Sequence, residues 1–184
     1  MKIVEKTEPF PHMVIDDFLP PDLFLEMKML VDSMPKAKPY EKFNTNLYRN
    51  GKINNGKFSE SIKESIKLFE RFVNENSVLP VDEDYWYSME YTSTGNKYKY
   101  PQHTDSLNKF LSLVLYVSPE DGEGTVLYNE DRLPNYRVKW KPNRALFFKR
   151  EDNTFHSYES KKDTRLTINL NVIVSRIKSG SKRI

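Results

Sequence analysis

Cysteine is absent from this chain of 184 residues, and glycine, histidine and tryptophan are scarce, with six, three and two copies. Without cysteine the chain can form no disulfide, hold no metal through thiolates and use no thiol nucleophile. A chain of this length buries enough surface to fold without such cross-links. The absence of cysteine fits a reducing compartment, and we expect the protein in the cytoplasm.

Long apolar runs and a strong excess of one charge are also missing. No stretch approaches the roughly 18 to 20 apolar residues of a membrane span, and charged residues interrupt the first sixteen positions, so we expect neither a membrane span nor a signal peptide. The 29 basic and 26 acidic residues leave a net charge of +3. This charge is too small and too dispersed to predict a nucleic-acid partner. The sequence does not indicate the oligomeric state.

The first half of the chain predicts two helices. Pro20 and Pro21 open the first, Pro35 ends it, and its apolar residues recur every three to four positions at Leu23, Met27, Leu30, Val31 and Met34. The second runs from about Ser59 to Asn76, with a capping box at Ser61 and Glu64 and an apolar stripe at Ile62, Ile66, Phe69 and Val73. Asparagine and glycine are dense over 43–58, which predicts a loop and a mobile lid.

The second half predicts β structure. Beyond a short strand at 13–18, the six strand candidates are 85–92, 110–117, 125–128, 144–148, 154–158 and 165–172. Many short strands at this spacing are typical of a sandwich or a barrel. No repeat or linker divides the chain, so we expect one domain over 1–184, with a helical support region at 1–80, a β core at 84–174 and a solvated basic tail at 175–184.

Two of the three histidines lie in β segments and form the most informative pattern. In an extended segment residues two apart point the same way, so His103 and Asp105 can reach one metal ion together. His156 follows 51 residues after Asp105 in a later strand, and Arg165 lies nine residues beyond it. Two imidazoles and a carboxylate form the facial triad of non-haem Fe(II) oxygenases, which leaves adjacent metal positions open. A guanidinium can hold the far carboxylate of a chelating keto acid such as 2-oxoglutarate through two charge-assisted bonds.

The order His103, Asp105, His156 and Arg165 on a strand-rich half resembles the Fe(II)- and 2-oxoglutarate-dependent dioxygenase superfamily, in its prolyl-hydroxylase-like branch. The other matching segments are 9–19, 91–95, 98–105, 113–117 with 122–125, 141–148 and 164–169. Three features depart from the pattern: Glu123-Gly124 replaces a pair of glycines, Arg165 stands where the collagen-type enzymes carry lysine, and Asn169 and Asn171 replace an aromatic.

The resemblance implies a fold and a set of cofactors. The fold is mainly β, a double-stranded β-helix or jelly-roll barrel buttressed by N-terminal helices. The cofactor is Fe(II), held by His103, Asp105 and His156, and the cosubstrates are 2-oxoglutarate and O2, with ascorbate as an optional reductant. These three ligands and Arg165 form the implied catalytic set.

Further roles follow from the same resemblance. Tyr91 is implied to place its hydroxyl on a carboxylate of 2-oxoglutarate, and a buried aromatic of the β core is the alternative for this residue. Thr167 lies two residues after Arg165 and shares its face of the strand, so we expect it to add a second hydroxyl. The third histidine, His12, lies far from the triad in sequence, and we interpret it as structural.

The implied reaction is hydroxylation of an unactivated C–H bond. A peptidyl proline is the first expected substrate, and a free amino acid or another small metabolite is the alternative, so the expected partner is a protein, a peptide or a small molecule. A cupin-like metal protein without oxygenase activity, a zinc hydrolase and a non-enzymatic binding module are the competing readings. A cupin would bring two histidines and a glutamate, a zinc hydrolase would need a glutamate base near its ligands, and neither explains Arg165.

Overall fold

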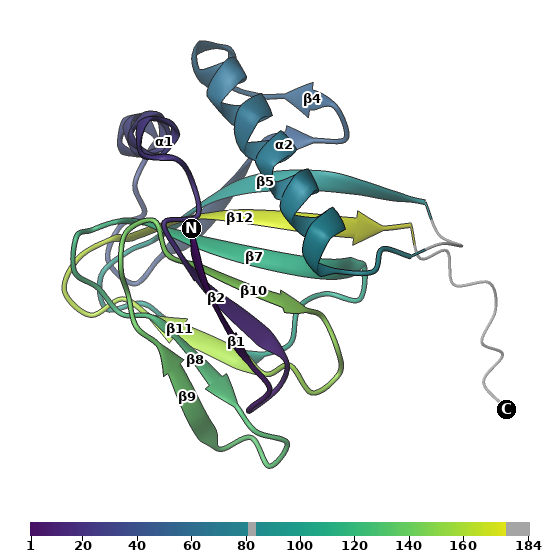
Figure 1. The fold of residues 1–184 in the computed structure, drawn as a ribbon. Coiled ribbons are helices and arrows are strands. Elements are labelled where there is room, and N and C mark those ends of the chain that lie inside the picture. The colour runs from purple at the N-terminus through teal and green to yellow at the C-terminus, as the bar shows by residue number, and fades with distance from the viewer. Residues whose placement is uncertain (81–83, 176–184) are drawn as a thin grey trace, which may run out of the picture.

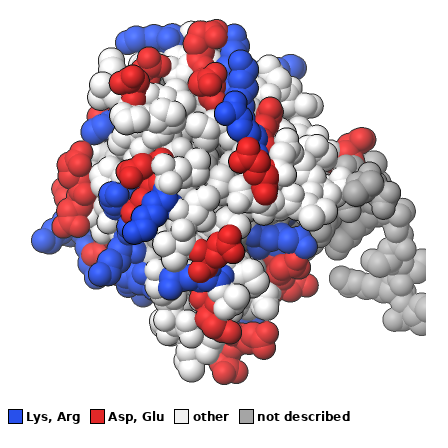
Figure 2. Space-filling model, viewed as in Figure 1, with Lys and Arg blue, Asp and Glu red and all other residues white. Residues whose placement is uncertain are grey.

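The structure is a computed structural model that describes residues 1–80 and 84–175. Almost all of the basic tail predicted at 175–184 therefore lies outside the described residues. Within the described ranges, no helix is both long enough and apolar enough to cross a lipid bilayer. On the face drawn in Figure 2, acidic and basic side chains are interspersed.

Two antiparallel sheets form the body of the molecule, one above the other in Figure 1. The larger sheet contains, in spatial order, β1 (Lys2–Lys6), β2 (His12–Asp16), β10 (Ala145–Lys149), β7 (Lys109–Ser118), β12 (Arg165–Val174), β5 (Tyr85–Thr94), β3 (Lys42–Arg49) and β4 (Lys52–Ile53). The smaller sheet contains β6 (Lys99–His103), β11 (His156–Glu159), β8 (Thr125–Tyr128) and β9 (Pro134–Val138).

Apolar side chains fill the space between the two sheets at one end. Leu127 and Val138 of the smaller sheet pack with Tyr116, Leu146 and Phe148 of the larger one. Apolar residues that alternate along both inner faces drive this closure. The result is the predicted double-stranded β-helix, and the six predicted strands of the second half are confirmed to within about two residues at each end.

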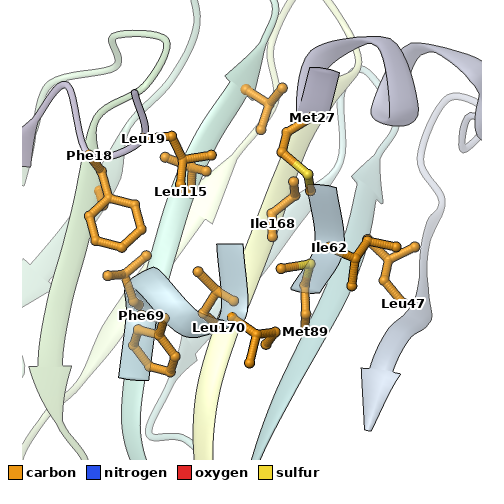
Figure 3. Close-up of a cluster of buried hydrophobic side chains, with 14 of the residues drawn as sticks. Phe18, Leu19, Met27, Leu47, Ile62, Phe69, Met89, Leu115, Ile168 and Leu170 are labelled. Carbon is orange, nitrogen blue, oxygen red and sulfur yellow. The ribbon is translucent and has the colours of Figure 1, made fainter. Parts of the chain in front are cut away.

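Both predicted helices are confirmed and cover the outer face of the larger sheet (Figure 1). Helix α1 spans Pro21–Ser33 and helix α2 spans Ser59–Asn76. Figure 3 shows Met27 of α1 and Ile62 and Phe69 of α2 around Ile168 and Leu170 of β12, and all five side chains are fully buried. The apolar stripes of the two helices are therefore core stripes, as their spacing predicts.

The predicted capping box at the start of α2 is wrong. The helix begins at Ser59, so Ser61 already lies inside its first turn and makes no cap. The Ser61 hydroxyl instead donates to the carboxylate of Glu26 on α1. The side chain that the local sequence assigns to capping therefore serves in the contact between the two helices.

The predicted loop at 43–58 is also wrong over most of its length. Strand β3 pairs with β5 along the sheet, followed by β4 and a short 3-10 helix, η1, at Gly56–Phe58. Asn44 is exposed, and Leu47, at the register shift between Asn46 and Tyr48, is buried in the core. Pairing with β5 outweighs the turn preference of the asparagines. The region 1–80 thus supplies four strands as well as both helices, and 43–49 is not a free lid.

Candidate active site

The three metal-ligand candidates meet where the smaller sheet faces the larger one. Strands β6 and β11 pair with His103 directly opposite His156, and the two ring centroids lie 4.3 Å apart. Asp105 follows two residues after the end of β6. Ligand atoms of the three residues all lie within 4.8 Å of one another. The structure therefore brings together in space the two segments that the sequence separates by more than fifty residues.

Backbone carbonyls orient both imidazoles. Nδ1 of His103 lies 3.0 Å from the carbonyl oxygen of Pro101, and Nδ1 of His156 lies 3.1 Å from that of Thr154. A proton on each Nδ1 makes these contacts hydrogen bonds and leaves each Nε2 as a free electron-pair donor, the arrangement that metal-bound histidines commonly show.

Two neighbours hold the Asp105 carboxylate. Lys109 donates to Oδ1 at 3.1 Å, and the Ser112 hydroxyl donates to Oδ2 at 2.6 Å. Ser112 also lies 3.3 Å from Oδ1 of Asn171 on β12. The serine hydroxyl therefore links the carboxylate to the floor of the larger sheet and fixes its direction.

Burial and neighbouring polar groups together set the protonation state of the triad. Burial, followed by the nearby His156, lowers the pKa of His103 to about 4, and burial lowers the pKa of His156 as well. Burial alone would raise the pKa of Asp105, but Lys109, His156 and Ser112 together bring it well below its usual range. At neutral pH the triad therefore consists of two neutral imidazoles and one carboxylate, the forms that bind a divalent cation.

The triad lines a cavity that also contains Arg165 and Thr167, both on β12. Arg165 is only 3% exposed, and its guanidinium carbon lies 4.4 Å from the ring centroid of Tyr158 and 5.3 Å from that of Trp140. Among the described residues, neither Nε nor Nη2 of Arg165 has a hydrogen-bond partner, and the buried Oγ1 atoms of Thr167 and Thr94 have none either. Buried donors without partners are costly, so this group is suited to an anion that is held between them.

Tyr91 does not reach this cavity. In the register between β5 and β12, Arg165 lies opposite Thr94 and Thr167 opposite Thr92, so the even-numbered residues of β5 face inward. Tyr91 lies on the helix side, is fully buried, and donates its hydroxyl to the carbonyl of Pro35 at 3.0 Å. The sequence-based placement of Tyr91 beside the cosubstrate therefore lacks support in the geometry, and Thr92 lines the cavity in its place.

The sequence analysis missed several residues that line the cavity. Lys42 is the first residue of β3, directly before the segment 43–58 that the sequence predicts as loop, so no pattern pointed to it. Tyr158 lies two residues after His156 and shares its side of β11, so the alternation of a strand could have found it. Lys109 and Ser112 contact Asp105 only because β7 runs beside it. His12 lies outside this cavity, buried with its Nδ1 2.8 Å from the carbonyl of Phe10.

Residues 89–173 match the family model of the 2OG-Fe(II) oxygenase superfamily. This segment belongs to that superfamily. It contains the three ligand candidates and Arg165. A comparison with curated proteins finds no match.

Three solved structures of similar fold are prolyl hydroxylases. The viral collagen prolyl hydroxylase of Paramecium Bursaria Chlorella virus-1, in a 2OG complex, is 17% identical, with a TM-score of 0.63 over 88% of this chain and 94% of that chain. A Pseudomonas putida prolyl-4-hydroxylase is 14% identical, with a TM-score of 0.64 over 88% and 91%. The prolyl hydroxylase of Trichoplax adhaerens, in complex with a hypoxia inducible factor peptide fragment, is 15% identical, with a TM-score of 0.65 over 88% and 83%. At these identities the likeness shows the shared fold.

The cofactors of the 2OG-Fe(II) oxygenases are Fe(II), 2-oxoglutarate and O2, and the residues present fit them. The triad offers two nitrogens and one oxygen within reach of a single ion. The unpartnered donors of Arg165 and Thr167 lie in the same cavity as that triad. A metal at one position and a carboxylate at the other would satisfy both sets of groups.

Proposed function

We propose that this oxygenase hydroxylates an unactivated C–H bond, with a peptidyl proline as the first candidate substrate. The observation that supports it most strongly is the joint presence, in one cavity, of a His-Asp-His triad and a buried arginine whose donors have no partner in the described protein. We take 1–184 as one domain and the cytoplasm as its compartment.

In this proposal His103, Asp105 and His156 hold Fe(II), and Arg165 and Thr167 hold the far carboxylate of 2-oxoglutarate. When bound, Fe(II) couples the conversion of 2-oxoglutarate and O2 into succinate and CO2 to the transfer of one oxygen atom into the substrate C–H bond. Lys109 and Ser112 keep the Asp105 carboxylate ionised and aimed at the metal position.

The protein itself contributes orientation and exclusion of water. The guanidinium of Arg165 is enclosed by Tyr116, Trp140 and Tyr158, so its end of the cavity is closed to solvent. In such a site a charge-assisted hydrogen bond is stronger than in water. The metal end is more open, since His103 is only partly buried. The cosubstrate therefore binds at depth, and the substrate approaches from the His103 side.

The prolyl candidate is supported by the similar structures, which are prolyl hydroxylases, one of them bound to a peptide fragment. A free amino acid or another small metabolite is the second candidate. The polar residues of the cavity wall near the metal position favour it, because Lys42, Asn169 and Asn171 offer hydrogen bonds rather than an apolar surface for a proline ring.

The test is a substrate screen read out by succinate release, with prolyl peptides and free amino acids side by side. Each reaction is run with and without 2-oxoglutarate and with and without ascorbate, and His156→Ala serves as the inactive control. We expect 2-oxoglutarate-dependent succinate release that one substrate class stimulates, with ascorbate prolonging turnover. A protein that neither binds nor consumes 2-oxoglutarate in the presence of Fe(II) would refute the proposed function.

A further inference from the structure

Lys42 is a cation of the cavity without an anionic partner. Among the described residues, no carboxylate oxygen lies within 4.0 Å of its Nζ. The ammonium lies instead 3.9 Å from the ring centroid of Tyr100 and 5.5 Å from that of Tyr158. Burial, and then the charges of Lys109 and Arg165, lower the pKa of Lys42 to about 8. The protein thus keeps a partly desolvated ammonium in the cavity wall, held by aromatic faces.

The charges of the cavity do not balance. Three cations line it, Lys42, Lys109 and Arg165, against the single carboxylate of Asp105. The two positive charges of Fe(II) and the two negative charges of 2-oxoglutarate cancel each other. Glu90, on the same face of the larger sheet, also acts on Lys42 and raises its pKa. With Glu90 counted, the loaded site would still carry an excess of one positive charge, and without it two, which a neutral prolyl residue leaves uncompensated. An anionic substrate would reduce it.

The position of Lys42 separates it from the cosubstrate's own anchors. Lys42, Thr94 and Arg165 lie in one row across β3, β5 and β12, so Lys42 stands two strands away from Arg165. The proposed function assigns the far carboxylate of 2-oxoglutarate to Arg165 and Thr167, and the other carboxylate belongs to the keto-acid end, which would chelate the metal. In this assignment, an anion bound at Lys42 is a different molecule.

A polar floor extends from Lys42 along the same face of the larger sheet. The next rows across β3, β5 and β12 are Asn44, Thr92 and Thr167, then Asn46, Glu90 and Asn169. Asn44 is exposed, and Asn46, Glu90 and Asn169 are half-buried, so this floor is open beside the metal ligands. Its amides and hydroxyls suit a substrate that is itself polar.

We propose that the substrate of this oxygenase carries a carboxylate and that Lys42 binds it. The inference rests on the proposed function and specifies its substrate class. The carboxylate belongs either to a free amino acid or to an acidic residue beside the proline of a peptide. Both sources offer Lys42 the same group.

The experiment compares matched probes that differ only in the charge of one group. The first set is the free L-amino acids against their primary amides, and the second is a blocked prolyl peptide with glutamate beside the proline against the same peptide with glutamine. Binding is measured without turnover, by calorimetry on protein loaded with Mn(II) and 2-oxoglutarate under anaerobic conditions. Backbone amide NMR shifts in β3 are followed on the same protein loaded with diamagnetic Zn(II) and 2-oxoglutarate. The variants are Lys42→Met and Lys42→Arg, with Lys52→Met on the exposed surface of β4 as the matched control.

At least one carboxylate probe is expected to bind roughly tenfold to a hundredfold more tightly than its amide, because it gains a charge-assisted bond. This preference is lost in Lys42→Met, partly kept in Lys42→Arg and fully kept in Lys52→Met. Preference for free amino acids or for the acidic peptide identifies the source of the carboxylate.

Two results would overturn the inference while leaving the proposed function intact. One is that no carboxylate probe shows binding that depends on Lys42. The other is that Lys42→Met weakens the binding of 2-oxoglutarate more than the binding of any carboxylate probe, which would make Lys42 a cosubstrate anchor. If the wild-type protein fails to bind 2-oxoglutarate at all, the proposed function itself fails.

Discussion

Replacing Arg165 should weaken 2-oxoglutarate binding without weakening the metal-free fold. The guanidinium is buried, and its Nε and Nη2 atoms have no partner among the described residues. One hydrogen bond from such a group to a carboxylate contributes about 1.5 to 3 kcal/mol, which corresponds to roughly a tenfold to 150-fold change in Kd. We therefore expect Arg165→Ala to raise the Kd for 2-oxoglutarate by at least tenfold. Arg165→Lys keeps the charge but loses the paired donors of the guanidinium, so its Kd should lie between those of the wild type and Arg165→Ala.

Removing the charge of Arg165 should not lower the stability of the metal-free protein. A buried charge without a counterion destabilises the folded state, so Arg165→Met, which keeps much of the packing against Tyr158, should leave the Tm of the metal-free protein equal or higher. Arg144 provides the matched control. It forms two bonds to the carboxylate of Asp16, at 2.6 and 3.0 Å, outside the cavity. Arg144→Met should lower Tm and leave 2-oxoglutarate affinity unchanged.

The assay is a 2-oxoglutarate titration of the Mn(II)-loaded protein by calorimetry, or by fluorescence of Trp140, which lies beside Arg165. Thermal unfolding of the metal-free variants gives the second readout. An unchanged Kd in Arg165→Ala would show that the far carboxylate is held elsewhere. A large fall in Tm for Arg165→Met would show that the arginine is instead a structural group of the barrel.

Three further predictions concern the metal, the pH and one glycine. His156→Ala should weaken Mn(II) binding by roughly a hundredfold or more, since one of three protein ligands is lost, and calorimetry that shows wild-type affinity would remove the ligand assignment. Burial lowers the pKa of all three histidines, to about 4 at His103, below the unfolded value of about 6.5. The unfolded chain therefore binds more protons, so the Tm of the metal-free protein should fall as the pH drops from about 7 toward 4, and a flat profile would contradict these shifts. A Cβ at Gly124 would overlap the carbonyl of Val138, so Gly124→Ala should lower the free energy of unfolding by about 1 to 3 kcal/mol. Gly56 has open space around it, so Gly56→Ala should not have this effect. Thermal unfolding compares the two variants.

Patterns that depend on neighbours in sequence were predicted well. Both helices follow from apolar spacing, the first also from its flanking prolines, and the main strands follow from alternation and turn residues. The triad and Arg165 could be nominated because strand periodicity relates His103 to Asp105, and because few residue types can hold iron or a dicarboxylate. These are local or chemical constraints, and they act in any fold that accepts the chain.

Which strands pair, and which face of each turns inward, was decided only by the tertiary structure. Strand β3 was hidden because its asparagines favour turns until β5 offers them a ladder partner. Tyr91 and Thr92 are neighbours in sequence, but the register with β12 sends one into the helix-covered core and the other into the cavity. Lys42 entered the site through the same pairing. A shift of one residue would exchange the two faces of a strand, so these placements depend on long-range packing that no local pattern contains.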